Sequence, residues 1–188
     1  MEKFQNRYRI PSARAAWWDY ANPGAYFITI CTHDRKHLFG QIYTGEMYLS
    51  PIGQIVDREW NKSFEIRAEL FCDAWIIMPN HIHAILRIEP TNGEIANQVQ
   101  THGRASLSID PPWGVAYRSP KSISSFVAGF KSAATTRINQ YQNTPKQPIW
   151  QTRFHDHIIR NDADYMRIAT YIEQNPRKWW DDKFFRNE

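Results

Sequence analysis

The hydrophobic positions of this chain fall into short apolar runs and longer helical stripes. The runs are rich in β-branched and aromatic residues, which is typical of β-strands. The expected strands are residues 25–32, 46–49 (the weakest), 70–78 and 81–89, with 149–160 extended. Because Pro79 and Asn80 make a turn between two of these runs, 70–78 and 81–89 are expected to form a hairpin.

Three further segments carry apolar residues at helical spacing. The first is expected to begin after Ser50, because serine is a good N-cap and a proline at the first helical position follows it. The same Ser-Pro signal at 119–120 predicts the start of a second helix that runs to about residue 141. A third begins at residue 161 or 162 and ends near Asn175, because a proline follows.

This order of strands and helices predicts an α+β fold, an antiparallel sheet with helices packed on it. The length of 188 residues suits one domain, expected over residues 24–180. Residues 1–23 contain three arginines and few core-like residues, so they are interpreted as a basic N-terminal arm. Residues 91–119 are polar and are expected to form a long loop.

Composition narrows the class of protein only a little. The net charge of +4 mildly favours a polyanionic partner. Most of the many aromatic residues are expected in the core, and a few could stack on bases. Cys31 and Cys72 lie in separate apolar runs, which indicates buried, reduced thiols. Because no signal peptide and no apolar run of about 20 residues is present, we expect a cytoplasmic protein without a membrane partner.

His81 and His83 lie two positions apart on an expected strand, so both side chains point to the same face, away from the core. Two neighbouring imidazoles can share one cation. By spacing alone, a pair of exposed polar residues is an equally good interpretation. His155 and His157 repeat the spacing, but their apolar surroundings favour structural or DNA-backbone hydrogen bonds.

Tyr171 lies beside the apolar stripe of the third helix, about 100° from its centre, while Tyr165 falls within that stripe. Asn175 follows Tyr171 by one turn, so the two polar side chains are neighbours. A tyrosine hydroxyl can attack a phosphodiester, and an amide oxygen can complete a metal site. On periodicity alone, a tyrosine at this boundary is more often a packed ring with a solvated hydroxyl.

Several motifs together resemble those of the single-tyrosine HUH transposases, and the subgroup of REP-associated tyrosine transposases most of all. The histidine–hydrophobic–histidine signature is His81-Ile82-His83, after Met78-Pro79-Asn80. The other matching stretches are Phe130-Lys131-Ser132, the run from Trp150-Gln151 to Arg160, Asp164-Tyr165, and Tyr171-Ile172 to Asn175-Pro176. The resemblance covers roughly residues 20–180.

The resemblance implies a ferredoxin-like sheet, Tyr171 as nucleophile, and a divalent cation, Mg²⁺ or Mn²⁺, bound by His81, His83 and Asn175. Gln174, one position out of register, is the less favoured amide. The implied substrate is single-stranded or hairpin DNA, cut through a 5′-phosphotyrosine intermediate and rejoined. The class includes monomers and homodimers, so a homodimer is one arrangement to consider.

Candidate phosphate contacts come from basic residues around these motifs, although any single one is more often ordinary surface. They are Lys131, Arg153, Arg160, Arg177 and Lys178. Two other functions compete. One is a catalytically silent DNA-binding protein derived from a transposase. The other is a metal-dependent hydrolase with water as nucleophile, disfavoured because no acidic residue lies near the histidines in the sequence.

Overall fold

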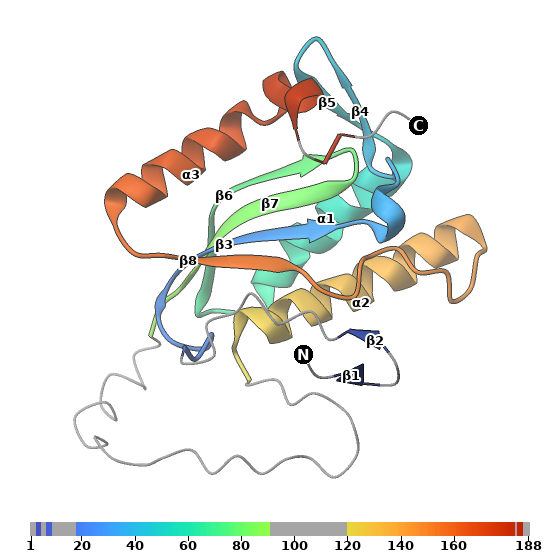
Figure 1. Ribbon diagram of the computed structural model, residues 1–188. Helices are drawn as coiled ribbons and strands as arrows, with labels where there is room; N and C mark the ends of the chain where they lie inside the picture. Colours follow the sequence, from blue (N-terminus) through green and yellow to red (C-terminus); the bar gives the residue numbers. More distant parts are fainter. Residues whose placement is uncertain (1–2, 5–6, 9–17, 91–119, 183, 186–188) are drawn as a thin grey trace.

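A four-stranded antiparallel sheet forms the centre of the computed structural model (Figure 1), which describes residues 3–4, 7–8, 18–90, 120–182 and 184–185. The strand order is β6-β7-β3-β8. The strands are β3 Gly24–Cys31, β6 Leu70–Met78, β7 His81–Ile88 and β8 His155–Ile159. The predicted hairpin therefore pairs β6 with β7, while β6 and β8 form the two edges.

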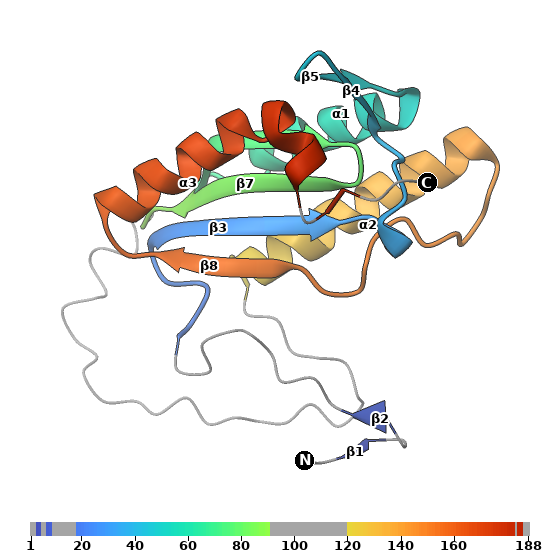
Figure 2. The same cartoon turned by 45° about the horizontal axis from the view of Figure 1, so that its top comes forward.

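The helices cover both faces of this sheet. Helices α1, Pro51–Glu65, and α2, Ile123–Gln142, lie together on one face. Helix α3, Asp162–Gln174, crosses the other face over β6 and β7 (Figure 2). The order β3-α1-β6-β7-α2-β8 is that of a ferredoxin-like fold, to which α3 is added. The predicted α+β fold class is confirmed.

Smaller elements surround this frame. Two short strand pairs are β1 Lys3–Phe4 with β2 Arg7–Tyr8, and β4 Gly40–Tyr43 with β5 Glu46–Leu49. Two 3-10 helices are η1 His33–Arg35 and η3 Pro176–Asp181. The expected loop at 91–119 and most of the expected basic arm at 1–23 lie outside the described residues. No helix in the described part of the chain is long and apolar enough to cross a membrane.

The helix caps decide where the helices begin. Ser50 accepts a hydrogen bond from the Gly53 amide at 3.0 Å, so the predicted start of α1 is confirmed. The predicted start of α2 after residues 119–120 is wrong, because Lys121 has a φ of 60° that a helix cannot contain. Ser122 caps α2 instead, accepting from the Ser125 amide at 3.2 Å.

Alternation along β7 divides its side chains between two cores. Ile82, Ala84, Leu86 and Ile88 are buried against α1 and α2, as the sequence predicts for the even positions. The centre of this larger core is Trp60, whose ring contacts Phe64, Trp75, Phe126 and Phe130 at centroid distances of 5.0–5.5 Å. His81, His83 and Ile85 face the opposite side, which α3 covers.

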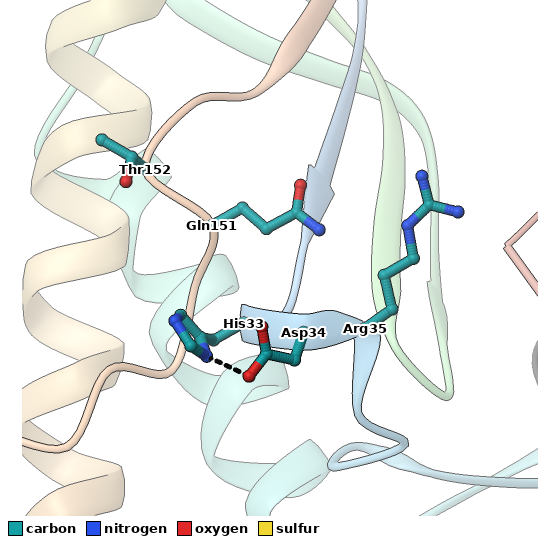
Figure 3. A pocket seen from close by; sticks show the side chains of 5 residues that line it. All are labelled: His33, Asp34, Arg35, Gln151 and Thr152. Atoms are coloured by element: carbon teal, nitrogen blue, oxygen red, sulfur yellow. Dashed lines mark ion pairs between the residues drawn. The ribbon is translucent and has the colours of Figure 1, made fainter. Parts of the chain in front are cut away.

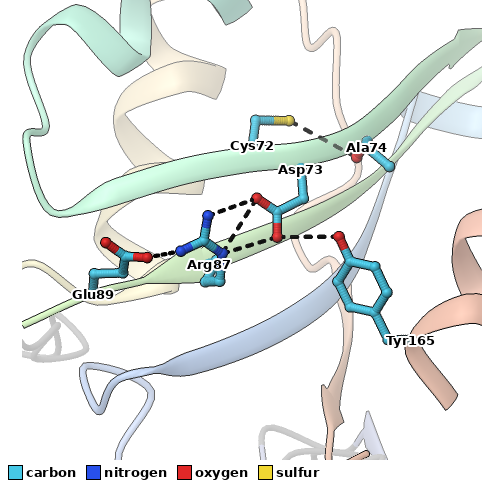
Figure 4. A network of polar contacts seen from close by, with 6 residues as sticks. All are labelled: Cys72, Asp73, Ala74, Arg87, Glu89 and Tyr165. Carbon is cyan, nitrogen blue, oxygen red and sulfur yellow. Dashed lines mark hydrogen bonds and ion pairs between the residues drawn. The ribbon is translucent and has the colours of Figure 1, made fainter. Parts of the chain in front are cut away.

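Helix α3 is fixed to the sheet by apolar packing and by polar contacts at its N-terminal end. Ile168 and Ile172 pack on Ile85 of β7. The Tyr165 hydroxyl donates to Asp73 Oδ2 at 3.2 Å, and Asp73 also pairs with Arg87 (Figure 4). His157 Nε2 lies 2.7 Å from Asp164 Oδ2. These contacts determine where the second half of α3, including Tyr171, lies over β7.

Candidate active site

His81 and His83 lie at the start of β7, with ring centroids 4.4 Å apart. Their side chains are only 0% and 1% exposed. The interpretation of an exposed polar pair is therefore wrong, because α3, η3 and the segment after η3 cover this face. Two buried imidazoles that lie side by side need hydrogen-bond partners, and those partners indicate the chemistry of the site.

The partner of His83 on the sheet is Thr29, which lies directly opposite it on β3. Thr29 Oγ1 is 2.8 Å from His83 Nδ1. The other ring nitrogen, Nε2, lies 3.1 Å from the Tyr171 hydroxyl oxygen on α3. The strand register and α3 packing together direct Nε2 of His83 towards the tyrosine.

His81 is oriented by Asn80, the last residue of the β6–β7 turn. The Asn80 amide nitrogen donates to the carbonyl oxygens of Arg35, at 3.0 Å, and Phe184, at 2.8 Å. This fixes the amide orientation, so Asn80 Oδ1 must be the acceptor in its 2.8 Å contact with His81 Nδ1. The proton of His81 is therefore on Nδ1, and Nε2 presents a lone pair, as a metal ligand requires.

Tyr171 is 36% exposed, and its ring packs edge-on against Phe27, so the phenol is partly open to solvent. Its hydroxyl lies 3.4 Å from Asp182 Oδ2, in addition to its contact with His83. Burial raises the pKa of Tyr171 to about 12, and the negative charge of Asp182 adds to the rise. At neutral pH the phenol is therefore protonated, and a nearby positive charge would be needed to favour the phenolate.

Asn175 caps the C-terminal end of α3 and is 2% exposed. Its amide nitrogen donates to Asp182 Oδ2 at 3.2 Å. Its Oδ1 is buried and finds no hydrogen-bond partner among the residues that the structure describes. A buried, unsatisfied amide oxygen costs about 1–3 kcal/mol, and a divalent cation would satisfy it. The donor chemistry of His81, His83 and Asn175 therefore fits a divalent cation.

Asp182 is the residue of this site that the sequence analysis missed. Its carboxylate and the ring nitrogens of His81 and His83 lie within 4.8 Å of one another. The sequence analysis found no acidic residue near the histidines in the chain. The fold brings one, Asp182, beside them. No local pattern marks Asp182, because its position depends on the path of η3 after Pro176.

Comparison with known proteins indicates the family to which the chain belongs. No family model matches the chain. An uncharacterized protein of Haemophilus influenzae is 30% identical over 174 residues, covering 93% of this chain and 92% of that protein. A REP-associated tyrosine transposase of Escherichia coli is 24% identical over 159 residues, which are 85% of this chain and 70% of the relative. A second protein of Haemophilus influenzae, named "Putative REP-associated tyrosine transposase", is 25% identical over 160 residues, which are 85% of this chain and 74% of the relative.

A solved structure of a REP-associated tyrosine transposase bound to a REP hairpin has the same fold. It superposes with a TM-score of 0.56 at 22% identity and covers 88% of this chain and 74% of that one. The chain belongs to the family of REP-associated tyrosine transposases.

The predicted phosphate contacts of this chain do not form one cluster. Lys131 of α2 donates to the backbone carbonyls of Gln151, at 2.8 Å, and Arg153, at 3.2 Å, so its ammonium helps to fix the segment before β8. The side chains of Arg153 and Arg160 are exposed on either side of β8. Arg177 and Lys178 are exposed on η3, directly after the helix that carries Tyr171.

An open hollow of about 530 Å³ lies at the end of β3, where η1 meets the segment after Trp150 (Figure 3). Its lining residues are His33, Asp34, Arg35, Gln151 and Thr152. Arg35 connects this hollow to the histidine pair, because its carbonyl oxygen accepts from Asn80 and its guanidinium lies 4.8 Å from the Phe184 ring centroid. The Phe184 ring is in turn 4.6 Å from that of His81.

Proposed function

We propose that this transposase is a metal-dependent endonuclease and strand transferase that acts on single-stranded DNA through a covalent tyrosine intermediate. The observation that carries the proposal is the position of the Tyr171 hydroxyl, 3.1 Å from Nε2 of the buried His83 in the same chain. A nucleophile and a cation-binding imidazole in contact form the minimal arrangement for attack on a phosphodiester. The same contact supports action of the tyrosine at the site of its own subunit.

In the proposed reaction, the Tyr171 oxygen attacks the phosphorus of the scissile phosphate. The Oη–P bond forms and the P–O3′ bond breaks. The phenol loses one proton, and the departing 3′-oxygen gains one to become a hydroxyl. The product is a 5′-phosphotyrosine. The step can be reversed by a 3′-hydroxyl, because one phosphodiester bond has been exchanged for another and no bond energy has been lost to water.

His81, His83 and Asn175 would hold the cation, which we expect to be Mg²⁺ or Mn²⁺. When bound, the cation supplies positive charge that polarises the phosphate and favours the phenolate. Asn80 and Thr29 support this site by holding the two imidazoles in place. Phe27 packs against both the His83 and Tyr171 rings, which restricts the movement of the nucleophile.

The proposed substrate is a hairpin with a flanking single strand, and its hairpin part is supported by the similar transposase that was solved bound to a REP hairpin. Arg177 and Lys178 lie nearest in the chain to Tyr171 and are exposed, so we assign them contacts with the DNA backbone. Arg153 and Arg160 would contact DNA beyond the sheet edge. Lys131 is a weaker candidate, because its ammonium already binds two carbonyl oxygens.

The test is covalent capture of a hairpin oligonucleotide with a single-stranded flank. After cleavage, the 5′-phosphate stays on the protein, so a label at the 3′ end of the DNA must migrate with the protein on a denaturing gel. We expect this band with wild-type protein and Mn²⁺, and not with EDTA. Tyr171→Phe should lose the band and keep DNA binding, whereas Tyr141→Phe, at an exposed tyrosine of α2 on the other face of the sheet, should keep both.

Two other functions predict different results from the same gel. A catalytically silent DNA-binding protein would shift the hairpin on a native gel and give neither cleavage nor a covalent band. A metal-dependent hydrolase is favoured by one observation, the cluster of His81, His83 and Asp182, which resembles a hydrolytic metal site. It would release cut DNA with Mn²⁺ but no protein-linked label, and Tyr171→Phe would still cut.

A further inference from the structure

The carboxylate of Asp182 occupies a position that the implied set of three cation ligands does not include. Its Oδ1 accepts a 2.7 Å hydrogen bond from the Phe184 amide, which holds the carboxylate in one orientation. Its Oδ2 faces the site and accepts from Asn175 Nδ2 and the Tyr171 hydroxyl. Asp182 therefore contacts two of the four residues on which the proposed function depends, and it clusters with the other two.

The groups that meet here are mostly acceptors. Asn175 Oδ1 is buried and without a hydrogen-bond partner in the described part of the chain, and His81 presents the lone pair of Nε2. Asp182 adds a negative charge to this site. The hydrogen bonds that it accepts do not require that charge, since a neutral oxygen can accept them too. Two neutral acceptors, Asn175 Oδ1 and His81 Nε2, that converge beside a fixed carboxylate are the chemistry of a cation site.

We propose that Asp182 is a fourth protein ligand of the divalent cation. This inference rests on the proposed function, and it extends the site from the sheet and α3 to the segment that follows η3. A carboxylate oxygen is a hard ligand, so it would shift the preference of a site with two imidazoles towards Mn²⁺ and Mg²⁺. The segment around Asp182 would then be held to the sheet partly through the cation.

The test is Mn²⁺ binding to the full-length protein without DNA, measured by isothermal titration calorimetry and by the loss of the free Mn²⁺ signal in electron paramagnetic resonance. Asp182→Asn keeps the size of the side chain and an oxygen that can accept from Phe184. We expect it to weaken Mn²⁺ binding at least about tenfold. Asp181→Asn, an exposed neighbour with the same change in charge, should bind like the wild type.

A second readout guards against loss of stability in the variant. The increase in Tm on adding Mn²⁺, relative to the same protein in EDTA, reports binding independently of the stability of the metal-free fold. The increase should be smaller in Asp182→Asn than in Asp181→Asn. Asp182→Glu, which keeps the charge on a longer side chain, should lie between Asp182→Asn and the wild type.

The outcomes separate this inference from the proposed function. If His81→Ala abolishes Mn²⁺ binding while Asp182→Asn binds as tightly as the wild type, Asp182 is not a ligand and the proposed function stands. If the wild-type protein binds no Mn²⁺, both the fourth ligand and the metal-dependent mechanism are wrong. Weakened binding in Asp182→Asn, with Asp181→Asn unchanged, supports the fourth ligand.

Discussion

At the scale of single residues, the site depends on which nitrogen of His81 carries the proton. The chain determines this through Asn80, whose amide nitrogen donates to two backbone carbonyls and whose oxygen must therefore accept from His81. One of those carbonyls belongs to Phe184, which is 104 positions away in the sequence. Asn80 thus fixes the tautomer of His81 and also holds the C-terminal segment beside it.

This arrangement predicts that Asn80→Ala weakens cation binding although Asn80 does not face the cation. Loss of the supporting hydrogen bond of a metal-binding histidine typically lowers metal affinity about 10–100-fold. The free energy of unfolding should fall by about 1–3 kcal/mol, because one buried and one part-buried carbonyl lose their donor. Calorimetry with Mn²⁺ and urea denaturation measure the two effects.

The matched control for this substitution is Asn61→Ala on the exposed side of α1, where the amide donates to Asp57 of the same helix and, among the described residues, reaches neither histidine. It should leave Mn²⁺ affinity unchanged. Equal Mn²⁺ affinity in Asn80→Ala and the wild type would show that His81 needs no support from Asn80.

The residues of the site differ in how far the sequence alone could find them. His81 and His83 share a face through the two-residue period of a strand, and Tyr171 and Asn175 through the turn of a helix. Local periodicity therefore paired these residues but left their function open, and the proposed roles came from the resemblance to the family. Asp182 and Asn80 act through contacts that close only in the folded chain. No spacing in the sequence records those contacts. Asn80 stands within the matching motif Met78-Pro79-Asn80, but the motif gave it no role, and Asp182 lies outside every matching stretch.

At the scale of elements, the start of α1 depends on a glycine. A Cβ on Gly53 would lie 2.0 Å from the carbonyl oxygen of Phe39, so no side chain fits there unless the backbone moves. Gly129, in α2, has open space at the same position. Both glycines lie inside helices, where alanine is otherwise the better residue.

We therefore predict opposite signs for two identical substitutions. Gly129→Ala should raise the free energy of unfolding by about 0.5–1 kcal/mol, because alanine reduces the freedom of the unfolded chain without a clash. Gly53→Ala should lower it by about 1–3 kcal/mol, because the added methyl group forces the helix away from Phe39. Urea denaturation of the two variants is the measurement. A stabilised Gly53→Ala would contradict the close packing of α1 on the segment before β4.

A second element-scale prediction concerns the beginning of α3. A hydrogen bond from His157, together with Arg167, holds the pKa of Asp164 below its ordinary value of 3.8. A lowered pKa stabilises the folded state above the unfolded value, and this contribution is lost as the pH falls through the folded value. Asp164→Asn should therefore destabilise the protein at about pH 5.5, and the difference from the wild type should shrink towards about pH 3.

The control is Asp162→Asn in the same turn of α3, which changes the charge at the helix terminus equally but leaves the His157 contact intact. Urea midpoints at the two pH values give the comparison. If Asp162→Asn and Asp164→Asn behave alike at both pH values, the effect arises from the helix dipole and not from the pair with His157.

The elements also show what hydrophobic pattern can and cannot predict. The strands 70–78 and 81–89 and the first and third helices follow from periodicity and caps. Strand β4, Gly40–Tyr43, was missed because it is short and only Ile42 of its residues is a strong strand former that faces inward. The start of α2 was placed too early because Lys121 adopts a left-handed backbone conformation, which a lysine residue in a sequence does not indicate.

At the scale of the whole molecule, the sheet separates the larger hydrophobic core from the candidate active site. The larger core with α1 and α2 lies on one face, and the candidate active site lies with α3 on the other. Neighbouring residues of β7 therefore serve different purposes, with Ile82 buried in the larger core and His81 and His83 at the site. This division predicts that loss of packing has different consequences on the two faces.

We compare Ile138→Ala in α2 with Ile172→Ala in α3, where the two isoleucines are 0% and 3% exposed. Each should lower the free energy of unfolding by about 2–5 kcal/mol, the usual cost of a cavity of this size. Ile138 lies across the sheet from the site, so the folded fraction of Ile138→Ala should form the covalent DNA band at the wild-type rate. Ile172 follows Tyr171 directly and packs on Ile85, so Ile172→Ala should slow the reaction beyond its loss of folded protein.

Rates are measured at a temperature where circular dichroism shows that both variants are folded. Equal rates in the two variants would mean that the packing of α3 does not position the nucleophile, and the phenol would then have to be oriented by the DNA itself.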